Sequence, residues 1–366
     1  MMWMRLLDIC DFQGGSQPPK EEWSFAEQEG YIRMLQIRDF TQSEKVTPEY
    51  IKISNCIKTC TEDDVLIARY GASIGKVLTG IAGAYNVAIM RTIPDTDIIR
   101  KRFLYYYLKS SYFQYAILNV GSRAAQAGFN KTDLAKLEIT CPELSKQDKI
   151  VKILEKVESI IQKRKDQLNA LDYIIKARFV EMFGDVKYGS ERWGGKPFKD
   201  ITINLDSKRK PVKDADRKRM QGIYPYYGAT GIVDYINDYR QDGDFLLISE
   251  DGKALELRSK PIAFLASGKI WVNNHAHVQQ CTDECNMIYL MYHINFMDIS
   301  IWVTGIDQKK LNRANLDTIP IVLPPIELQE QFAAFVHQVD KSKVVVQKAL
   351  DEAQLLFDSL MQKYFG

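Results

Sequence analysis

Two of the four histidines and two of the six cysteines of this chain lie within one short segment, as His275, His277, Cys281 and Cys285. Imidazole and thiolate together are the ligand types that zinc prefers. Structural zinc usually draws a second, well-separated pair, however, and the corresponding segment of the first half, residues 86–89, contains neither residue type. Zinc therefore stays open as the lesser alternative: we predict no metal, and for these histidines either packing or contact with DNA.

A glycine-rich segment, residues 71–76, is similar to a phosphate-binding loop. Only three residues separate Gly71 from Gly75, one too few for that loop, and Val77 stands where a Ser or Thr would hold magnesium. Nucleotide binding is therefore disfavoured. A glycine turn that presents Arg69, Tyr70 and Lys76 to a polyanion is the better interpretation, because glycine lets neighbouring groups approach a phosphate closely.

A basic run covers residues 208–219. Its seven cations, with only Asp214 and Asp216 between them, are Lys208, Arg209, Lys210, Lys213, Arg217, Lys218 and Arg219. Such runs are usually solvated faces. Here tyrosines 224, 226 and 227 follow closely, as suits a surface that holds phosphates and stacks on bases.

No catalytic constellation is found in the sequence. The glycine fingerprint of a methyl-donor or dinucleotide site is missing, and so is the Asn/Asp-Pro-Pro-aromatic motif of amino-methylating enzymes. Pro324-Pro325 precedes a predicted helix, where prolines are tolerated in the first turn. We therefore predict that this chain alone is not an enzyme.

The elements that must position these residues belong to an internal repeat. Residues 134–184 align without a gap on residues 316–366 at an offset of 182. The aligned pairs include Pro142 with Pro324 and Gln147 with Gln329, and both copies end in Phe-Gly.

Each copy continues into a long heptad pattern, which predicts helices over residues 145–183 and 324–364. The first would be roughly 58 Å long at about 1.5 Å per residue. A helix with one apolar stripe must bury that stripe, and its duplicate is the natural partner; two separate surface helices are the alternative. If a pseudo-twofold axis relates the halves, the helices are antiparallel. The predicted packing residues are Ile150, Leu154, Val157, Ile161, Leu168, Leu171, Val336, Val339, Val346, Leu350, Phe357 and Leu360.

The rest of the chain forms two further units that follow one another's plan loosely. Strand-like runs at residues 31–38, 64–71 and 86–91 are followed by a predicted helix over 102–116. The second run, the third run and the helix have weaker counterparts at 244–252, 274–278 and 287–294. We predict the α+β class, with two mixed α/β globular domains separated by an antiparallel coiled coil. The predicted boundaries are 1–141 for the first globular domain, 142–184 for the first helix, 185–323 for the second domain and 324–366 for the second helix.

Composition limits the remaining possibilities. The formal net charge of +2 excludes a strongly basic field over the whole molecule, so polyanion binding must come from local patches. No apolar run reaches the length of a membrane span and the N-terminus lacks the apolar core of a signal peptide, so we expect a cytoplasmic protein without a membrane partner. The six cysteines share no framework between the halves, which favours reduced thiols.

Two diverged globular units, each followed by proline, glutamine and a long heptad helix, resemble the specificity subunit of a type I DNA restriction-modification system. The most specific segment is residues 319–331, Ile-Pro-Ile-Val-Leu-Pro-Pro-Ile-Glu-Leu-Gln-Glu-Gln, with a weaker copy at 137–147 that has one proline instead of two. The resemblance covers the whole chain, which is somewhat short for the family.

The resemblance implies a non-catalytic reader of double-stranded DNA. Each globular unit would be a target recognition domain for one half of a bipartite sequence, and the helices would set the unread gap. It also implies two methyltransferase subunits, which use S-adenosylmethionine to methylate adenine, and motor-nuclease restriction subunits. No cofactor is expected in this chain; S-adenosylmethionine, ATP and Mg are expected in the partners. A coiled-coil scaffold with two protein-binding heads is the alternative function.

The candidate DNA contacts are polar, cationic or aromatic residues near the glycine turns and basic runs. They are Lys20, Arg33, Arg38, Arg69, Tyr70, Lys76, Lys208, Arg209, Lys210, Lys213, Tyr226, Tyr227, Lys253, Lys269, Asn274 and His275.

Overall fold

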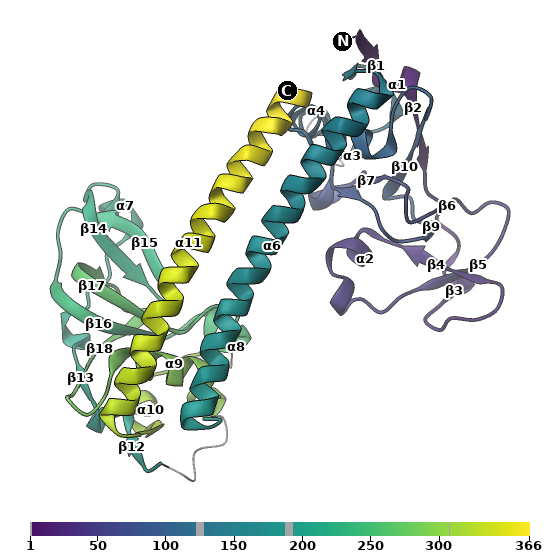
Figure 1. The fold of residues 1–366 in the computed structure, drawn as a ribbon. Coiled ribbons are helices and arrows are strands. Elements are labelled where there is room, and N and C mark those ends of the chain that lie inside the picture. Colours follow the sequence, from purple (N-terminus) through teal and green to yellow (C-terminus); the bar gives the residue numbers. More distant parts are fainter. Residues whose placement is uncertain (1, 122–127, 187–192, 307) are drawn as a thin grey trace. The chain divides into compact units, whose positions relative to one another are not determined.

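The computed structural model describes residues 2–121, 128–186, 193–306 and 308–366. Contacts divide the chain into two compact units (Figure 1). Unit 1 contains Met1–Lys165 and Lys348–Gly366, and unit 2 contains Asp166–Gln347. Both units mix helices with sheets, which confirms the predicted α+β class.

Two sheets form the globular part of unit 1. The first has the order β2-β10-β7-β8 and is antiparallel throughout. Its strands are β2 (Cys10–Gly14), β10 (Ile89–Pro94), β7 (Leu66–Ala68) and β8 (Val77–Leu78). The second has the order β3-β5-β4-β9-β6, in which β4 and β9 are parallel. Its strands are β3 (Trp23–Ser24), β5 (Tyr50–Lys52), β4 (Tyr31–Leu35), β9 (Gly83–Tyr85) and β6 (Thr59–Cys60).

The short helices of unit 1 differ from the predicted ones at their ends. They are α1 (Leu6–Ile9), α2 (Ile37–Thr41), α3 (Lys101–Lys109), α4 (Ser111–Gly121) and α5 (Lys131–Leu134). The strand predicted over 31–38 ends at Leu35, because Gln36 and Asp39 form a capping box that starts α2. The single helix predicted over 102–116 is wrong: it is interrupted at Ser110, whose extended backbone ends α3.

One mixed six-stranded sheet dominates unit 2, with the order β13-β18-β16-β17-β14-β15. Its strands are β13 (Thr202–Asn204), β18 (Ala276–Cys281), β16 (Gln241–Ser249), β17 (Ala263–Val272), β14 (Gln221–Gly228) and β15 (Gly231–Ile236). The short helices are α7 (Asp214–Arg217), α8 (Lys253–Leu257), α9 (Met287–Phe296) and α10 (Arg313–Thr318). Short 3-10 turns at 20–22, 43–45, 71–73, 198–200, 206–208 and 300–302 complete the two units.

The repeat is visible in a two-stranded antiparallel ribbon that each unit contains. In unit 1, β1 (Met2–Arg5) pairs with β11 (Glu138–Cys141); in unit 2, β12 (Gly195–Pro197) pairs with β19 (Pro320–Val322). Ile139 and Ile321, which the 182-residue offset aligns, are both buried. The apolar residues before each repeated proline therefore form equivalent strands.

Two helices of 40 residues each, α6 (Leu144–Phe183) and α11 (Ile326–Phe365), follow these ribbons. Within unit 2 they are antiparallel (Figure 1): Asp172 forms an ion pair with Lys343 at 2.5 Å, the Arg178 guanidinium lies over the Phe335 ring, and Phe183 contacts Phe332. Within unit 1, the start of α6 and the end of α11 share one apolar core. The predicted packing of the two long helices is confirmed, and the alternative of separate surface helices is excluded.

The predicted packing residues differ in their burial. Those with buried side chains are Ile150, Leu154, Val157, Ile161, Val336, Val339 and Phe357, and those half-buried are Leu168, Leu171, Val346, Leu350 and Leu360. At the helix ends the buried positions step by four instead of by alternating threes and fours. These additional buried residues are Ile175, Phe179, Phe183, Met361 and Phe365. The stripe shifts there because the helix ends pack against α9 in unit 2 and against α3 in unit 1.

Candidate DNA-binding surface

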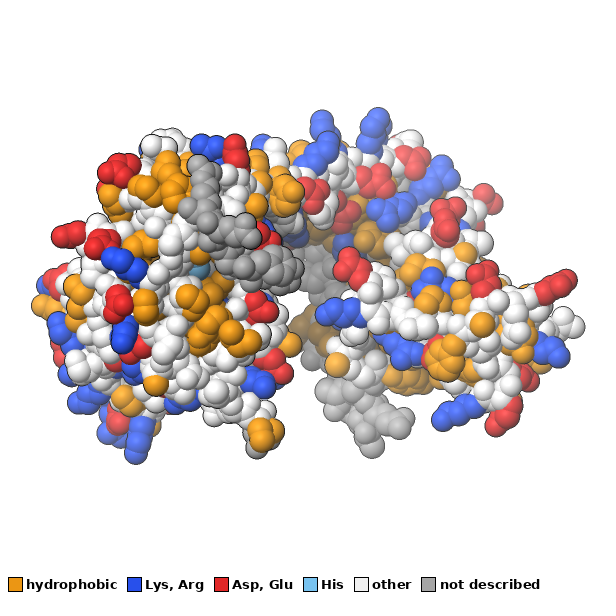
Figure 2. All heavy atoms as spheres, turned by 90° about the horizontal axis from the view of Figure 1, so that it is seen from below, with side chains coloured by type: hydrophobic (Ala, Val, Ile, Leu, Met, Phe, Trp, Pro, Cys, Tyr) orange, Lys and Arg blue, Asp and Glu red, His pale blue; other side chains and the backbone are white. Residues whose placement is uncertain are grey.

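Most of the candidate contact residues have exposed side chains. The exposed ones are Lys20, Arg38, Tyr70, Lys76, Lys208, Lys210, Lys213, Lys253, Lys269, Asn274 and His275; Arg33, Arg69 and Arg209 are half-buried, and Tyr226 and Tyr227 are buried. On the face of the molecule in Figure 2, cations are interspersed with carboxylates and apolar groups. This mixture agrees with the small net charge of the chain and with the expectation that DNA is contacted by local groups of cations.

In unit 1 the predicted glycine turn holds three candidates together. Gly71 and Gly75 both have positive φ, at 70° and 81°, which only glycine adopts easily. Lys76 and Tyr70 are exposed on this turn. The Arg69 Nε donates a 2.9 Å hydrogen bond to the Phe129 carbonyl, and its guanidinium lies 4.8 Å from the centre of the Tyr70 ring. Arg69 therefore orients Tyr70 as well as carrying charge.

Two other arginines of unit 1 are engaged in ion pairs. Arg33 contacts the buried carboxylate of Asp39 at 2.8 Å, and Arg38 contacts Glu49 at 2.6 Å. Asp39 also accepts the Gln36 backbone N–H at the start of α2. The position of Arg33 favours a structural role in this turn, since a buried carboxylate needs its cation.

In unit 2 the backbone of the basic loop 208–213 is fixed at three points. The Lys208 carbonyl accepts from Arg240, the Lys210 carbonyl accepts from the Trp271 indole at 2.7 Å, and the Val212 N–H donates to the Tyr226 hydroxyl at 2.9 Å. With the main chain held inward, the lysine side chains of the loop are exposed to solvent. The sequence pattern suggested base stacking for Tyr226 and Tyr227, but both lie in the core of unit 2.

Arg209 lies in a buried ionic network and not on the surface of the loop. Its guanidinium contacts Glu250 at 2.5 Å and Asp206 at 3.2 Å, and donates to the Ala276 carbonyl. Burial alone would raise the pKa of Asp206, but the hydrogen bonds from His277 and Val278 and the charge of Arg209 outweigh it and lower that pKa. The arrangement favours a structural role for Arg209.

Substitutions at two neighbouring residues test the structural role of Arg209. Arg209→Ala is expected to lower the free energy of unfolding by about 3 kcal/mol, because it leaves the Asp206 and Glu250 carboxylates without their shared cation. Lys208→Ala, one residue earlier and exposed, is expected to change it by less than about 0.5 kcal/mol. Denaturant unfolding of both variants checks this. Equal losses would show that the network contributes nothing specific.

The two histidines of the segment 275–285 both contact carboxylates. His277 is fully buried, with Nδ1 2.7 Å from Asp206 and Nε2 2.8 Å from the Leu311 carbonyl oxygen. His275 is exposed, with Nδ1 2.8 Å from Asp251. Among the residues that the structure describes, no group of three or more His, Cys, Asp or Glu side chains could hold a metal ion.

Contacts among these groups join two turns of unit 2 to the basic loop. The Glu250 N–H donates to the His275 carbonyl at 2.9 Å, and Arg209 binds both Glu250 and the Ala276 carbonyl. The exposed Lys253, Asn274 and His275 therefore lie near the loop that carries Lys208 and Lys210. This surface, built from separate loops, can offer several groups to one ligand.

A glutamine clamp connects each globular part to its long helix, and sequence reasoning did not identify this role. Gln147 and Gln329 are both fully buried. Gln147 Nε2 donates to the Pro142 and Ile98 carbonyls, each at 2.8 Å, and Oε1 accepts from the Arg100 N–H at 2.8 Å. The signal that could have identified the clamp was the repetition of a polar residue within an apolar pattern.

Gln329 repeats the same three bonds in unit 2. Its Nε2 donates to the Pro324 carbonyl at 2.8 Å and to the Glu284 carbonyl at 3.1 Å, and Oε1 accepts from the Asn286 N–H at 2.8 Å. Arg100 and Asn286 immediately precede α3 and α9. Each clamp therefore fixes the start of a globular-domain helix to the first turns of α6 or α11.

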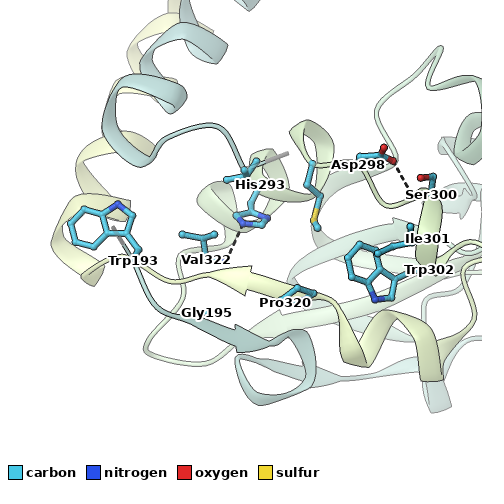
Figure 3. Close-up of a pocket in the computed structure, with 11 residues that line it drawn as sticks. Trp193, Gly195, His293, Asp298, Ser300, Ile301, Trp302, Pro320 and Val322 are labelled. Carbon is cyan, nitrogen blue, oxygen red and sulfur yellow. Dashed lines mark hydrogen bonds between the residues drawn. The ribbon is translucent and has the colours of Figure 1, made fainter. Parts of the chain in front are cut away.

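Unit 2 also contains a cavity of about 370 Å³, shown in Figure 3. Its lining is mainly apolar and includes Trp193, Met297, Trp302 and Val322. His293 also lines it, and burial lowers the pKa of this imidazole to about 3. The Val322 N–H donates to His293 Nε2 at 3.1 Å. A neutral imidazole of this kind is poorly suited to proton transfer near neutral pH.

We expect His293 to make the stability of unit 2 sensitive to acid. The pKa of His293 in the folded state lies below the usual value of about 6.5, so the unfolded chain takes up a proton first as pH falls. The free energy of unfolding should therefore be unaffected by this group above pH about 6.5 and should fall as pH drops toward 3, by about 3 kcal/mol at pH 4. Replacing His293 with tyrosine should flatten this dependence. Tyrosine is the residue of the first repeat, Tyr107, when the helices are aligned by their clamps. Urea unfolding from pH 7 to 4 checks it, and parallel slopes would contradict it.

The family model for the type I restriction modification DNA specificity domain matches residues 1–170 and again 190–353. A type I restriction enzyme specificity subunit of Haemophilus influenzae is 38% identical over 144 residues, which are 39% of this chain and 36% of that protein, so the match spans about a third of that relative. The EcoprrI specificity subunit of Escherichia coli is 22% identical over 92% of this chain and 87% of its own length.

Solved structures share the fold. The type I restriction-modification S subunit from M. genitalium superposes with a TM-score of 0.59 at 16% identity, covering 100% of this chain and 96% of that chain. A chain from work on complex assembly and conformational transition of the type I R-M system has a TM-score of 0.59 at 14% identity, covering 100% of this chain and 97% of that chain. At such identities the likeness concerns the fold alone.

Proposed function

Because this chain belongs to the type I restriction-modification DNA specificity family, we propose that it reads a bipartite double-stranded DNA target and directs partner subunits to it. The observation that carries this proposal is the duplication: the family domain is matched twice, and each copy brings a mixed α/β globular part clamped to one long helix. Two globular parts that share one architecture but differ in sequence suit two half-sites that differ in sequence.

The local chemistry supports contact with DNA. Exposed lysines on fixed loops, as at Lys76 in unit 1 and Lys208 and Lys210 in unit 2, can neutralise phosphates without a strongly basic molecule. Exposed side chains such as Tyr70 in unit 1 and Asn274 in unit 2 can approach base edges.

Catalysis would be supplied by the partners. We propose two methyltransferase subunits, which use S-adenosylmethionine, and restriction subunits, which use ATP and Mg, in a cytoplasmic complex. Apolar side chains on the outer faces of both long helices support docking there: Tyr173 and Val345 in unit 2 and Leu355 in unit 1 are each about 70% exposed. Among the described residues, no helix has the length and hydropathy needed to cross a membrane.

Exchange of one globular part tests the function. When residues 185–323 are replaced by the matching part of another family member, one half of the methylated sequence should change and the other should stay, as read by methylation mapping of host DNA with the partner subunits present. The reciprocal exchange of residues 1–141 should change the other half. A scaffold would leave both halves unchanged, and a change of both would contradict modular reading.

A further inference from the structure

Two tyrosines of unit 2 lie beside the basic loop 208–213. Tyr239, in the turn between β15 and β16, is 37% exposed. Its ring packs against the ring of the half-buried Tyr224, with 5.2 Å between the ring centres. The Lys269 ammonium lies 4.7 Å from the centre of the Tyr239 ring. An aromatic ring and a cation therefore both contact Tyr239 and limit its movement, while part of its side chain stays open to solvent.

Hydrogen bonds join these side chains to the basic loop. Arg240 directly follows Tyr239, and its Nε donates to the Lys208 carbonyl at 2.9 Å. The Arg240 N–H donates to the Ile270 carbonyl at 2.9 Å, and Ile270 directly follows Lys269. Tyr239, Lys269 and the lysines of the loop therefore belong to one connected surface, whose parts are fixed by main-chain groups.

The charges around Tyr239 favour an anionic partner. The exposed cations of this surface are Lys208, Lys210, Arg240 and Lys269, and the exposed carboxylates beside them are those of Asp238 and Asp242. Cations suit phosphates, which position a protein on DNA but carry no sequence information. A tyrosine among such cations can supply that information, because its hydroxyl can bond to a base edge and its ring can contact a thymine methyl group.

We propose that Tyr239 is a specificity-determining residue for the half-site that unit 2 reads, and that it contacts the edge of one base pair while Lys269 binds a phosphate. This inference rests on the proposed function. It gives Tyr239 the role that the sequence pattern suggested for Tyr226 and Tyr227, whose side chains are buried. Because its ring is already packed against Tyr224, Tyr239 loses little side-chain freedom when it binds.

DNA binding by the full-length chain in complex with its methyltransferase subunits tests the proposal. Methylation mapping first identifies the target, and duplexes are then made in which each base pair of the target is changed in turn. Tyr239→Ala should lower the affinity for the unchanged duplex by about fivefold or more and should abolish the preference at one base pair of unit 2's half-site. The preferences at the other base pairs should remain.

The phosphate contact has a different signature. Lys269→Ala should weaken binding to all duplexes by a similar factor, and it should reduce the slope of log affinity against log salt concentration by about one. The proposal is overturned if Tyr239→Ala keeps the preference at every base pair, or if it weakens binding to all duplexes equally. An unchanged salt slope in Lys269→Ala would contradict the phosphate contact.

Three controls accompany these variants. Tyr115→Ala removes a tyrosine of unit 1 that is 73% exposed, and it should leave the preferences over unit 2's half-site unchanged. Urea unfolding checks that Tyr239→Ala is folded; if its midpoint falls, Tyr239→Leu, which keeps an apolar contact with Tyr224, takes its place. Exchange of residues 185–323 separates the two ideas. If the exchange changes one half-site and the Tyr239 variant changes no preference, this inference alone fails; if the exchange changes neither half-site, the proposed function fails.

Discussion

Replacing Gln329 with glutamate is expected to lower the stability of unit 2 by about 3 kcal/mol or more at pH 7. The new carboxylate would keep the acceptor for Asn286 but would place an oxygen against the Pro324 and Glu284 carbonyls, which now accept from Nε2. A fully buried position leaves that charge without a partner. Amide exchange over α9 measures the loss where it arises.

The same variant should depend on pH in a characteristic way. Burial raises the pKa of a carboxyl group above its usual value of about 4.3, so the loss is greatest at neutral pH and shrinks as pH falls toward that value. Gln338→Glu, exposed on the same helix, is the matched control and should be nearly neutral. Gln147→Glu should reproduce the defect over α3 in unit 1. If Gln329→Glu and Gln338→Glu behave alike, the clamp is not structural.

Removing one heptad from the middle of each long helix is expected to shift the preferred gap between half-sites. Deletion of residues 164–170 and 345–351 shortens each helix by about 10.5 Å, at about 1.5 Å per residue. This equals about three base pairs at about 3.4 Å per pair. Affinity for the original target should fall by at least tenfold, since one head no longer reaches its half-site. Binding to a set of DNAs that differ only in gap length measures the shift.

Whole heptads preserve the apolar stripe, which is why they are the suitable change. Each heptad rotates the stripe by only about 20°. Removing four residues from one helix alone displaces that stripe and should destabilise the chain, so it provides the control for loss of folding. An unchanged optimum gap in the folded double deletion would show that the helices do not set the spacing.

Much of the architecture could be predicted because its signals are local in sequence. An ungapped repeat and a heptad pattern are properties of consecutive residues, and they predicted helices at 145–183 and 324–364 where the structure has Leu144–Phe183 and Ile326–Phe365. The shorter elements were predicted less well. The break at Ser110 depends on one residue's backbone conformation, which the helical pattern around it conceals.

The candidate DNA-contact residues, too, could be predicted only in part. Sequence could mark Lys208, Arg209 and Lys210 as a basic run, but it could not show that Arg209 alone faces inward. That difference depends on Glu250 and Ala276, which lie 41 and 67 residues further along the chain. The burial of Tyr226, which was predicted to contact DNA, was missed for the same reason: its core neighbours include residues of other strands of the sheet.

The sequence by itself therefore determined the duplication, the long helices and the family to which the chain belongs. Only the tertiary structure decided which polar groups face solvent and which form hydrogen bonds inside the fold. The two glutamine clamps are the main example of the second kind. The physical reason is that a buried donor or acceptor must be satisfied by whatever group the fold places beside it. For Gln147 and Gln329 those groups include carbonyls 49 and 45 residues away.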